Sequence, residues 1–327
     1  MNRSIGAMVC AAMLGFAALP AQAETTLRVT LQLPLASHLG QNLLVFKEEI
    51  EKTSDITVEI YDSAQLYKDN EVPEAVGSGQ IEMGVASLAR YVGDIPAVDI
   101  FYMPFVLDSE AKVRAAAAPG SPVRGPLDAA ILETGARVLW WQAYGGNVLL
   151  SKGAALKGPE DLQGKKVRVF GKWLGEWAKE LGGAPTLISG SEQFLAYQRG
   201  TVDIGMTGLS GVSSRKLWEV MDAVTLVNNA DIEFLVVMNE DVWQGLTDAQ
   251  RDAITAAAVK AEIAVRDYMS AFETRTIEEA KANGMTVHQP TPEELARWKA
   301  ASAPVIEKWL KDAGPLGRQV LDAANAL

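Results

Sequence analysis

The sequence predicts an α/β protein made of two similar lobes that are spanned by one long helix. Three observations support this fold class. Segments with strand and helix periodicity alternate along the chain, which indicates a largely parallel sheet. One short pattern occurs twice, at residues 79–87 and 200–208. A long helical pattern then covers residues 247–282, which is too long for a single lobe of this size.

The first residues are typical of a secretory signal peptide. Arg3 precedes an apolar stretch at residues 5–19, and Ala21-Gln22-Ala23 has the small-residue pattern of a cleavage site. We expect the mature chain to begin at Glu24 in the periplasm of a bacterium. Cys10, the only cysteine, lies inside the apolar stretch. The mature chain is therefore expected to have no disulfide, no thiol nucleophile and no cysteine metal site.

The length and the net charge of the chain limit the kinds of partner that it can bind. Removing 23 of the 327 residues leaves 304, which is enough for two packed lobes. Without Arg3, the mature chain has 29 of the 30 basic residues and all 41 acidic residues, which gives a net charge of −12. Nucleic acid and anionic membranes both require a basic face, so neither is an expected partner. No later apolar run has the length to span a bilayer, so we expect no membrane insertion.

The first elements follow one another in a regular order. Residues 26–33 alternate as a strand, residues 40–52 form an amphipathic helix, and residues 56–61 form a second strand. Turns rich in Pro, Gly and Asp follow each unit, but no low-complexity linker divides the chain. Ordered segments must therefore cross any boundary between lobes.

The repeated pattern has the same residue types in the same order in both copies. Each copy follows a helix-like segment, at residues 71–76 and 192–199. The match is either coincidence or the sign of a helix–turn–strand unit in each lobe, with strand ends at Ser87 and Thr207 that face a shared cleft. The acidic residues of the pattern, Glu82 and Asp203, are expected to hold the turn.

Two helical regions close the chain. A capping box, Thr247 with Gln250, begins the pattern at residues 247–282, which at about 1.5 Å per residue exceeds ~50 Å and should span both lobes. A second capping box, Thr291 with Glu294, begins the C-terminal helical region. Its residue Trp298, like Trp309 further on, is expected to pack as core.

Arg168 is the strongest candidate for a binding residue. In the stretch Lys-Lys-Val-Arg-Val-Phe-Gly, alternation puts Val167 and Val169 on one strand face and Arg168 with Phe170 on the other. A helical pattern begins at once afterwards. An arginine beside a helix N-terminus and the carboxyl end of a strand is suited to binding a small anion. The alternative is a solvated arginine whose stem rests on apolar neighbours.

Signals for catalysis are weak. His38 and His288 are the only imidazoles, and nothing in the sequence brings them together. Ser213 and Lys216 have the S-x-x-K spacing of some serine acylases, but no K-T-G follows and the segment has the pattern of an ordinary helix surface. A G-x-S-x-G motif, a phosphate loop and an H-E-x-x-H motif are all missing from the sequence. The sequence supports a binding protein better than an enzyme.

An ordered set of motifs resembles the periplasmic solute-binding proteins of TRAP (tripartite ATP-independent periplasmic) transporters. The resemblance covers nearly the whole mature chain and is carried by Gln65-Leu66, residues 79–87, Met103-Pro104-Phe105, residues 159–169, residues 191–198 and Val202-Asp203. It implies a two-lobed α/β fold of the periplasmic binding protein type, with a long helix that bridges both lobes. The implied division is lobe I at residues 24–144 and about 232–265, lobe II at 145–231, the bridging helix at about 247–284, and a C-terminal helical region at 285–327.

The resemblance also implies roles for single residues. Arg168 matches the arginine that pairs with the ligand's carboxylate in the family. Asp69, Ser87 and Arg90 correspond to contacts from the first lobe, and Thr207 replaces an asparagine that often assists the carboxylate. The alternative is that Asp69 caps the following helix and that Arg90 is solvated. The full predicted ligand-binding set is Arg168, Asp69, Ser87, Arg90, Gln32, Tyr144, Asn147, Phe170, Trp173 and Thr207.

Two departures from the family pattern limit the choice of ligand. Relatives that bind sialic acid have a second arginine where this chain has Val148, just after Tyr144 and Asn147. Many relatives have D-G-Q-E-N-P where this chain has Asp203-Ile-Gly-Met-Thr-Gly208. With apolar surface from Phe170 and Trp173 nearby, we expect a compact ligand with a single acidic group.

The predicted function is that of an extracytoplasmic solute receptor. It would bind a small organic anion, a carboxylate or a sulfonate, between its lobes and deliver it to the membrane permease subunits of a TRAP transporter. No catalytic residue, metal ligand or cofactor is expected. The alternatives are the binding protein of an ATP-driven importer, a periplasmic hydrolase and a ligand sensor without a transport role.

Overall fold

The computed structural model describes residues 25–327, so the predicted signal peptide lies outside the described residues. The strands are β1 (Thr25–Thr30), β2 (Ile56–Tyr61), β3 (Met83–Ser87), β4 (Ala136–Ser151), β5 (Lys166–Val169), β6 (Ala184–Leu187), β7 (Ile204–Gly208), β8 (Ala223–Thr225), β9 (Asp231–Asn239) and β10 (Thr286–His288). The α-helices are α1 (His38–Thr53), α2 (Val72–Gly77), α3 (Glu110–Ala117), α4 (Arg124–Leu132), α5 (Lys172–Glu180), α6 (Gln193–Gln198), α7 (Leu209–Ser214), α8 (Glu240–Gly245), α9 (Asp248–Ala282) and α10 (Pro292–Asn325). Short 3₁₀-helices are η1 (Leu88–Tyr91), η2 (Pro96–Tyr102), η3 (Pro159–Leu162) and η4 (Leu217–Glu219).

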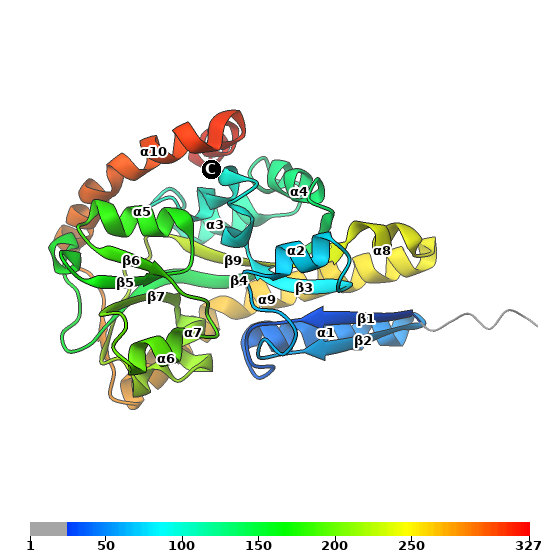
Figure 1. Ribbon diagram of the computed structural model, residues 1–327, viewed down its shortest axis with the longest axis horizontal. Helices are drawn as coiled ribbons and strands as arrows, with labels where there is room; N and C mark the ends of the chain where they lie inside the picture. Colours follow the sequence, from blue (N-terminus) through cyan, green and yellow to red (C-terminus); the bar gives the residue numbers. More distant parts are fainter. Residues whose placement is uncertain (1–24) are drawn as a thin grey trace, which may run out of the picture.

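The strands form one continuous hydrogen-bonded array that runs through both lobes (Figure 1). Its order is β2-β1-β3-β9-β4-β7-β5-β6, with β8 and β10 attached to β4. Strand β4 is 16 residues long; it pairs with β9 up to Gly146 and with β7 from Asn147 onward. This change of partner lies two residues beyond the predicted lobe boundary at Tyr144, and the division into lobes stays a prediction.

The sheet is mixed rather than largely parallel. Parallel pairs join β1 to β2 and β3, β5 to β6 and β7, and β8 to β10. The pairs of β4 with β7, β8 and β9, and of β3 with β9, are antiparallel. The chain crosses to the second lobe along β4 and returns along β9, so these two strands must run in opposite directions. The alternation pattern does not reveal such crossing strands.

The repeated pattern is a helix–turn–strand unit in each half, as predicted. Helix α2 leads into β3 and helix α6 leads into β7. The first glycine of each copy, Gly79 or Gly200, makes the turn with φ of 76° or 67°, which favours glycine. At the second glycine, Gly84 or Gly205, a Cβ would lie 2.5 Å or 2.2 Å from a side chain of the preceding helix. Both copies therefore need glycine for the same two reasons.

The acidic residue of each copy binds the backbone of a neighbouring strand, and its role in holding the turn stays a prediction. Glu82 Oε2 accepts a hydrogen bond from the backbone N–H of Arg28 in β1 at 3.0 Å. Asp203 Oδ2 accepts one from the backbone N–H of Lys166, at the start of β5, at 2.8 Å. The internal symmetry therefore extends to the parallel strand beside each unit, which makes β5, with Arg168, the counterpart of β1.

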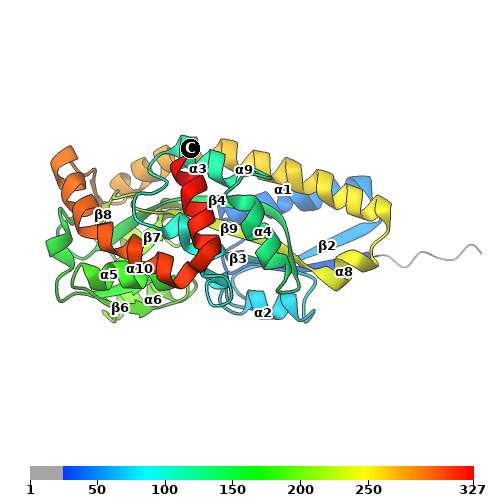
Figure 2. The same ribbon diagram turned by 90° about the horizontal axis from the view of Figure 1, so that it is seen from above.

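Helix α9 connects the two lobes. It has 35 residues, so it is roughly 50 Å long, and Figure 2 shows it running along most of the length of the molecule. The predicted capping box of Thr247 and Gln250 is present at its start. The helix packs against α1 and β4 and then, further along, against α7 and β10. The prediction of a long bridging helix is confirmed.

Helix α10 lies over η2 and α5 at the upper edge in Figure 1. It is two helices in sequence, because Gly314 (φ 59°, ψ −149°) breaks the helical backbone. Trp298 and Trp309 are fully buried, as predicted, and Trp309 Nε1 donates to the carbonyl of Pro96 in η2 at 2.8 Å. Among the helices of residues 25–327, none is long and apolar enough to cross a membrane.

Candidate ligand-binding cleft

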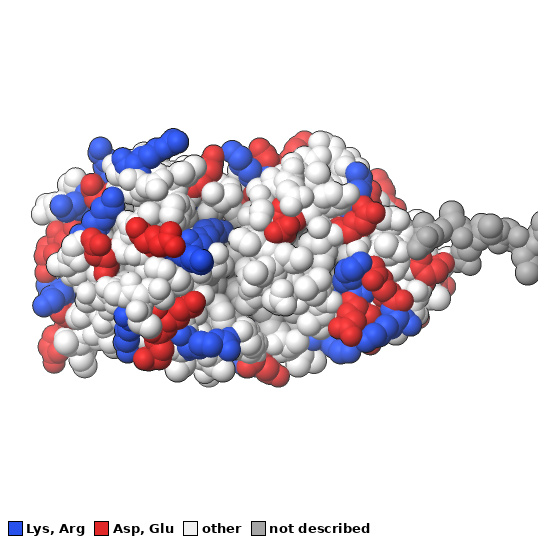
Figure 3. Space-filling model, turned by 90° about the horizontal axis from the view of Figure 1, so that it is seen from below, with Lys and Arg blue, Asp and Glu red and all other residues white. Residues whose placement is uncertain are grey.

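A small cavity lies between the two lobes at the carboxyl ends of β1, β3, β5 and β7. Its volume is about 20 Å³, which is room for roughly one water molecule. In Figure 3 the surface between the two halves is hollowed, with basic and acidic side chains beside the hollow. Twelve residues line the cavity: Gln32, Asp69, Ser87, Tyr144, Arg168, Phe170, Gly190, Gln193, Thr207, Arg215, Ile232 and Phe234. Ligands of open α/β sheets bind at this edge.

Arg168 is buried, with 3% of its surface exposed. Its Nε donates to the carbonyl of Ile188 at 3.0 Å, and its Nη1 donates to the carbonyl of Met206. The carbon of its guanidinium lies 5.3 Å from the centre of the Phe170 ring. These contacts fix the side chain at the strand end, and the alternative of a solvated arginine is wrong.

The charge of Arg168 has no counter-ion within the described part of the chain. No Asp or Glu of residues 25–327 forms an ion pair with it, although the structure has 22 such pairs. Burial, together with the nearby positive charges of Arg215 and Arg90, lowers its pKa to about 10. The guanidinium remains protonated at neutral pH. A buried cation without a partner favours the entry of an anion.

Asp69 and Arg90 form a buried ion pair on the first-lobe side of the cavity. Arg90 Nε and Asp69 Oδ2 are 2.5 Å apart, and the two side chains are 6% and 2% exposed. Asp69 Oδ1 also accepts from the backbone N–H of Ser87 at 2.9 Å. The N-cap of α2 is Glu71, so Asp69 does not cap this helix. Because the Arg90 side chain is buried in the ion pair, Arg90 is not solvated. Both parts of the alternative account are wrong.

Neutral polar groups complete the cavity wall. A Cβ at Gly211 would lie 2.4 Å from Thr207 Oγ1 and 2.9 Å from Tyr144 Oη, so both oxygens lie close to the backbone of α7. Gln32 Oε1 is buried and has no hydrogen-bond partner among the described residues. These groups offer a polar ligand both donors and acceptors close to Arg168.

Seven of the ten predicted residues line this cavity, namely Arg168, Asp69, Ser87, Gln32, Tyr144, Phe170 and Thr207. The other three do not. Arg90 lies behind Asp69, and Asn147 donates from Nδ2 to Asn229 Oδ1 at 2.8 Å. Trp173 is buried beside Asp99, whose Oδ2 accepts from the Trp173 backbone N–H at 3.4 Å. Ligand contact stays a prediction for all ten.

The sequence interpretation missed Arg215, which lines the cavity from the end of α7. The surrounding segment was interpreted as an ordinary helix surface, and Ser213 Oγ does donate to Glu279 rather than meet Lys216. Arg215 is half-buried, and its Nη1 donates to Tyr144 Oη at 3.1 Å. Because α7 is only six residues long and ends before Arg215, helical periodicity could not predict where this side chain points.

Neither histidine lies in the cavity wall. His38 is buried, with its Nε2 3.0 Å from the carbonyl oxygen of Ala143. Burial lowers its pKa to about 4. His288 Nε2 lies 2.8 Å from Glu294 Oε2 at the start of α10. Within residues 25–327, no group of three or more potential metal-ligating side chains is placed to hold a metal ion.

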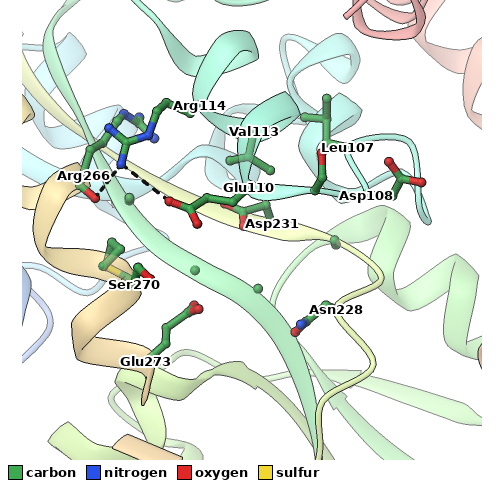
Figure 4. Close-up of a pocket in the computed structure, with 16 residues that line it drawn as sticks. Leu107, Asp108, Glu110, Val113, Arg114, Asn228, Asp231, Arg266, Ser270 and Glu273 are labelled. Atoms are coloured by element: carbon green, nitrogen blue, oxygen red, sulfur yellow. Dashed lines mark hydrogen bonds and ion pairs between the residues drawn. The ribbon is translucent and has the colours of Figure 1, made fainter. Parts of the chain in front are cut away.

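A second, larger cavity of about 260 Å³ lies among α3, β4, β9 and α9 (Figure 4). Its wall has four carboxyl groups, those of Asp108, Glu110, Asp231 and Glu273, beside two arginines. Burial, together with the charges of Glu233 and Glu273, raises the pKa of Asp231 well above its usual range. Arg114 in this wall lies 3.6 Å from Glu110 and donates to the backbone carbonyl of Arg266 at 3.2 Å. This cavity therefore suits an anion far less well than the cleft does.

The two lobes, the bridging helix and the positively charged cavity at the strand ends define a solute-binding protein. The chain belongs to the family of bacterial extracellular solute-binding proteins, family 7, whose model matches residues 32–312. As the motifs predicted, it is a periplasmic solute-binding protein of the TRAP type.

Individual relatives are similar over most of their length. The C4-dicarboxylate-binding periplasmic protein of Rhodobacter capsulatus is 29% identical over 336 residues, which cover 99% of each chain. The ectoine-binding periplasmic protein of Halomonas elongata is 23% identical and covers 86% of this chain and 83% of its own.

A solved structure supports the fold. A Bordetella pertussis extracytoplasmic solute receptor that binds pyroglutamic acid matches with a TM-score of 0.87 at 22% identity, and the match covers 92% of this chain and 99% of that chain. The prediction of a two-lobed periplasmic binding protein fold is confirmed.

Proposed function

We propose that this protein binds a small organic anion, a carboxylate or a sulfonate, in the cleft between its lobes and delivers it to the membrane permease of a TRAP transporter. The observation that carries the proposal is Arg168, a buried cation without a counter-ion that is fixed at a strand end by two backbone carbonyls. The predicted signal peptide and the family both support a location in the periplasm.

The small volume of the cleft supports binding by lobe closure. A cavity of about 20 Å³ has no room for an organic acid, so the lobes must separate before the ligand enters, or side chains must move. One ion pair, from Lys68 before α2 to Glu192 before α6, joins the corresponding segments of the two halves at 2.9 Å. We infer that opening breaks this pair and that closure buries the ligand against Arg168.

The named ligands of the relatives agree with an anionic or zwitterionic solute. They include C4-dicarboxylates, ectoine, pyroglutamate and succinate. For the hydrolase alternative, a nucleophile with an adjacent base would be needed in the cavity wall. Ser213 is bonded to Glu279, and His38 and His288 lie elsewhere.

Thermal unfolding in the presence of single compounds tests this proposal. A carboxylate or sulfonate ligand at a hundred times its Kd should add about 2.7 kcal/mol to the free energy of unfolding and raise the Tm. Neutral sugars should not change the Tm. If a broad panel of organic acids leaves the Tm unchanged while polyols or amines raise it, the anion assignment is wrong. Recovery of the ligand in chemically unchanged form separates a receptor from a hydrolase.

A further inference from the structure

We propose that Arg215 forms a second anion-binding subsite in the same cleft, so that the receptor selects a compact ligand with two anionic groups, such as a short dicarboxylate. This inference rests on the proposed function and specifies the class of its ligand. Arg168 would bind one carboxylate and Arg215 the other. No sequence motif assigns a role to Arg215.

The charges of the cavity wall favour a ligand with two anionic groups. Arg168 and Arg215 both line the cavity, and no carboxylate of residues 25–327 forms an ion pair with either. Asp69 is the only acidic residue in the wall, and Arg90 already neutralises it at 2.5 Å. The wall therefore carries two guanidinium charges without a counter-ion. A monoanion balances only one of them, whereas a dianion balances both.

Neutral acceptors hold Arg215 in place. Its Nη1 donates to Tyr144 Oη at 3.1 Å. With the amide oxygen of Gln193 turned toward it, that oxygen accepts from Nε at 3.3 Å and from Nη1 at 3.1 Å. Tyr144 and Gln193 fix the direction of the guanidinium but leave its charge unbalanced. Such positioning reduces the entropy that ordering the side chain costs when a ligand binds.

Glycine backbone next to Arg215 leaves space for its guanidinium. A Cβ at Gly190 would lie 2.9 Å from Arg215 Nη2 and 2.8 Å from Gln32 Oε1. The second-lobe arginine and the first-lobe glutamine therefore reach the same place beside Gly190. A carboxylate that binds Arg215 from the cavity side would lie next to both lobes, as a ligand that stabilises closure must.

These contacts correct the premise behind the expectation of a single acidic group. That expectation took Val148 as a sign that the cleft lacks a second arginine. Val148 is indeed fully buried in an apolar cluster with Leu150 and Val212. The second positive charge comes instead from Arg215, at a different place in the sequence and in the cavity wall.

Isothermal titration with matched pairs of acids tests the inference. Malonate, succinate and glutarate are each compared with their monoamides, which keep the length but lose one charge, at about pH 7.5, where carboxylates are ionised. At least one dicarboxylate should bind the parent protein about tenfold or more tightly than its monoamide. Arg215→Gln should abolish this preference, whereas binding of the monoamide changes less than about threefold.

Two further variants separate charge from structure. Arg215→Lys keeps the charge and should retain part of the preference for the dicarboxylate. Arg199→Gln removes an exposed arginine of the same lobe and should leave all affinities unchanged. Equal losses for dicarboxylate and monoamide in Arg215→Gln would overturn the inference, because Arg215 would then only support Tyr144. Monoanions that bind at least as tightly as every dicarboxylate would overturn it too, while the proposed function would stand.

Discussion

Replacement of Arg168 should strongly weaken ligand binding. Arg168 is only 3% exposed, so a carboxylate paired with its guanidinium is desolvated. Removing one partner of such a pair leaves the other charge buried, which costs roughly 2–5 kcal/mol. Arg168→Ala should therefore raise the Kd by about thirtyfold to several thousandfold.

Lysine at the same position should restore the charge but not the function. Arg168 uses Nε and Nη1 to hold the carbonyls of Ile188 and Met206, and its side chain also lines the cavity. An ammonium concentrates its three donors at one point, so it cannot reproduce the planar fork with which arginine holds two carbonyls and a carboxylate together. We expect Arg168→Lys to bind more tightly than Arg168→Ala and clearly more weakly than the parent.

The assay is isothermal titration of the acid that gives the largest thermal shift, with Arg199→Ala as the matched control. Circular dichroism must show that each variant is folded, since alanine leaves two carbonyls without a donor at about 1–3 kcal/mol each. If the parent, Arg168→Ala, Arg168→Lys and Arg199→Ala proteins bind the acid with Kd values within about threefold of one another, Arg168 does not belong to the site and the reasoning is refuted.

Two further predictions concern stability. Asp69→Asn removes the partner of buried Arg90 and should lower the free energy of unfolding by about 3–5 kcal/mol, which is measured as a lower urea midpoint. The control Glu192→Gln breaks an exposed pair and should change the free energy of unfolding by less than about 1 kcal/mol. Burial raises the pKa of Asp99 to about 8, above its value in the unfolded chain. The stability that comes from protonated Asp99 is therefore present at acidic pH and lost as the pH rises through about 8, by up to about 1.4 kcal/mol per pH unit. In Asp99→Asn this loss should be missing when urea unfolding is measured between about pH 6 and pH 8.5. An Asp69→Asn protein as stable as the parent, or parallel pH profiles for the parent and Asp99→Asn, would contradict these assignments.

Local patterns predicted most of the fold because the determinants are themselves local. The capping box at Thr247, the glycines of the repeat and the apolar spacing of Trp298 each act within a few residues, and all appear in the structure as expected. The mixed sheet was not predicted, because the direction of β4 and β9 depends on how the chain crosses between lobes. Periodicity alone has no information about that crossing.

The candidate site was only partly predictable for the same reason. Arg168 could be found because it alternates with apolar residues in a strand that leads into a helix. Arg215 could not, since it follows a six-residue helix and reaches the cavity only through the packing of that helix beside β7. The resemblance matched Asp69 and Arg90 to ligand contacts of the first lobe, but it did not reveal their mutual ion pair, which joins residues 21 positions apart. Such a pair is visible only in three dimensions.

A crystal structure of the protein with the acid that raises the Tm most would test the central claim directly. A carboxylate or sulfonate oxygen should lie between the lobes, about 2.7–2.9 Å from a guanidinium nitrogen of Arg168, as expected for a charge-assisted hydrogen bond. An acid bound elsewhere, for example beside Arg114 in the second cavity, would contradict the claim. So would a ligand in the cleft whose neutral end faces Arg168.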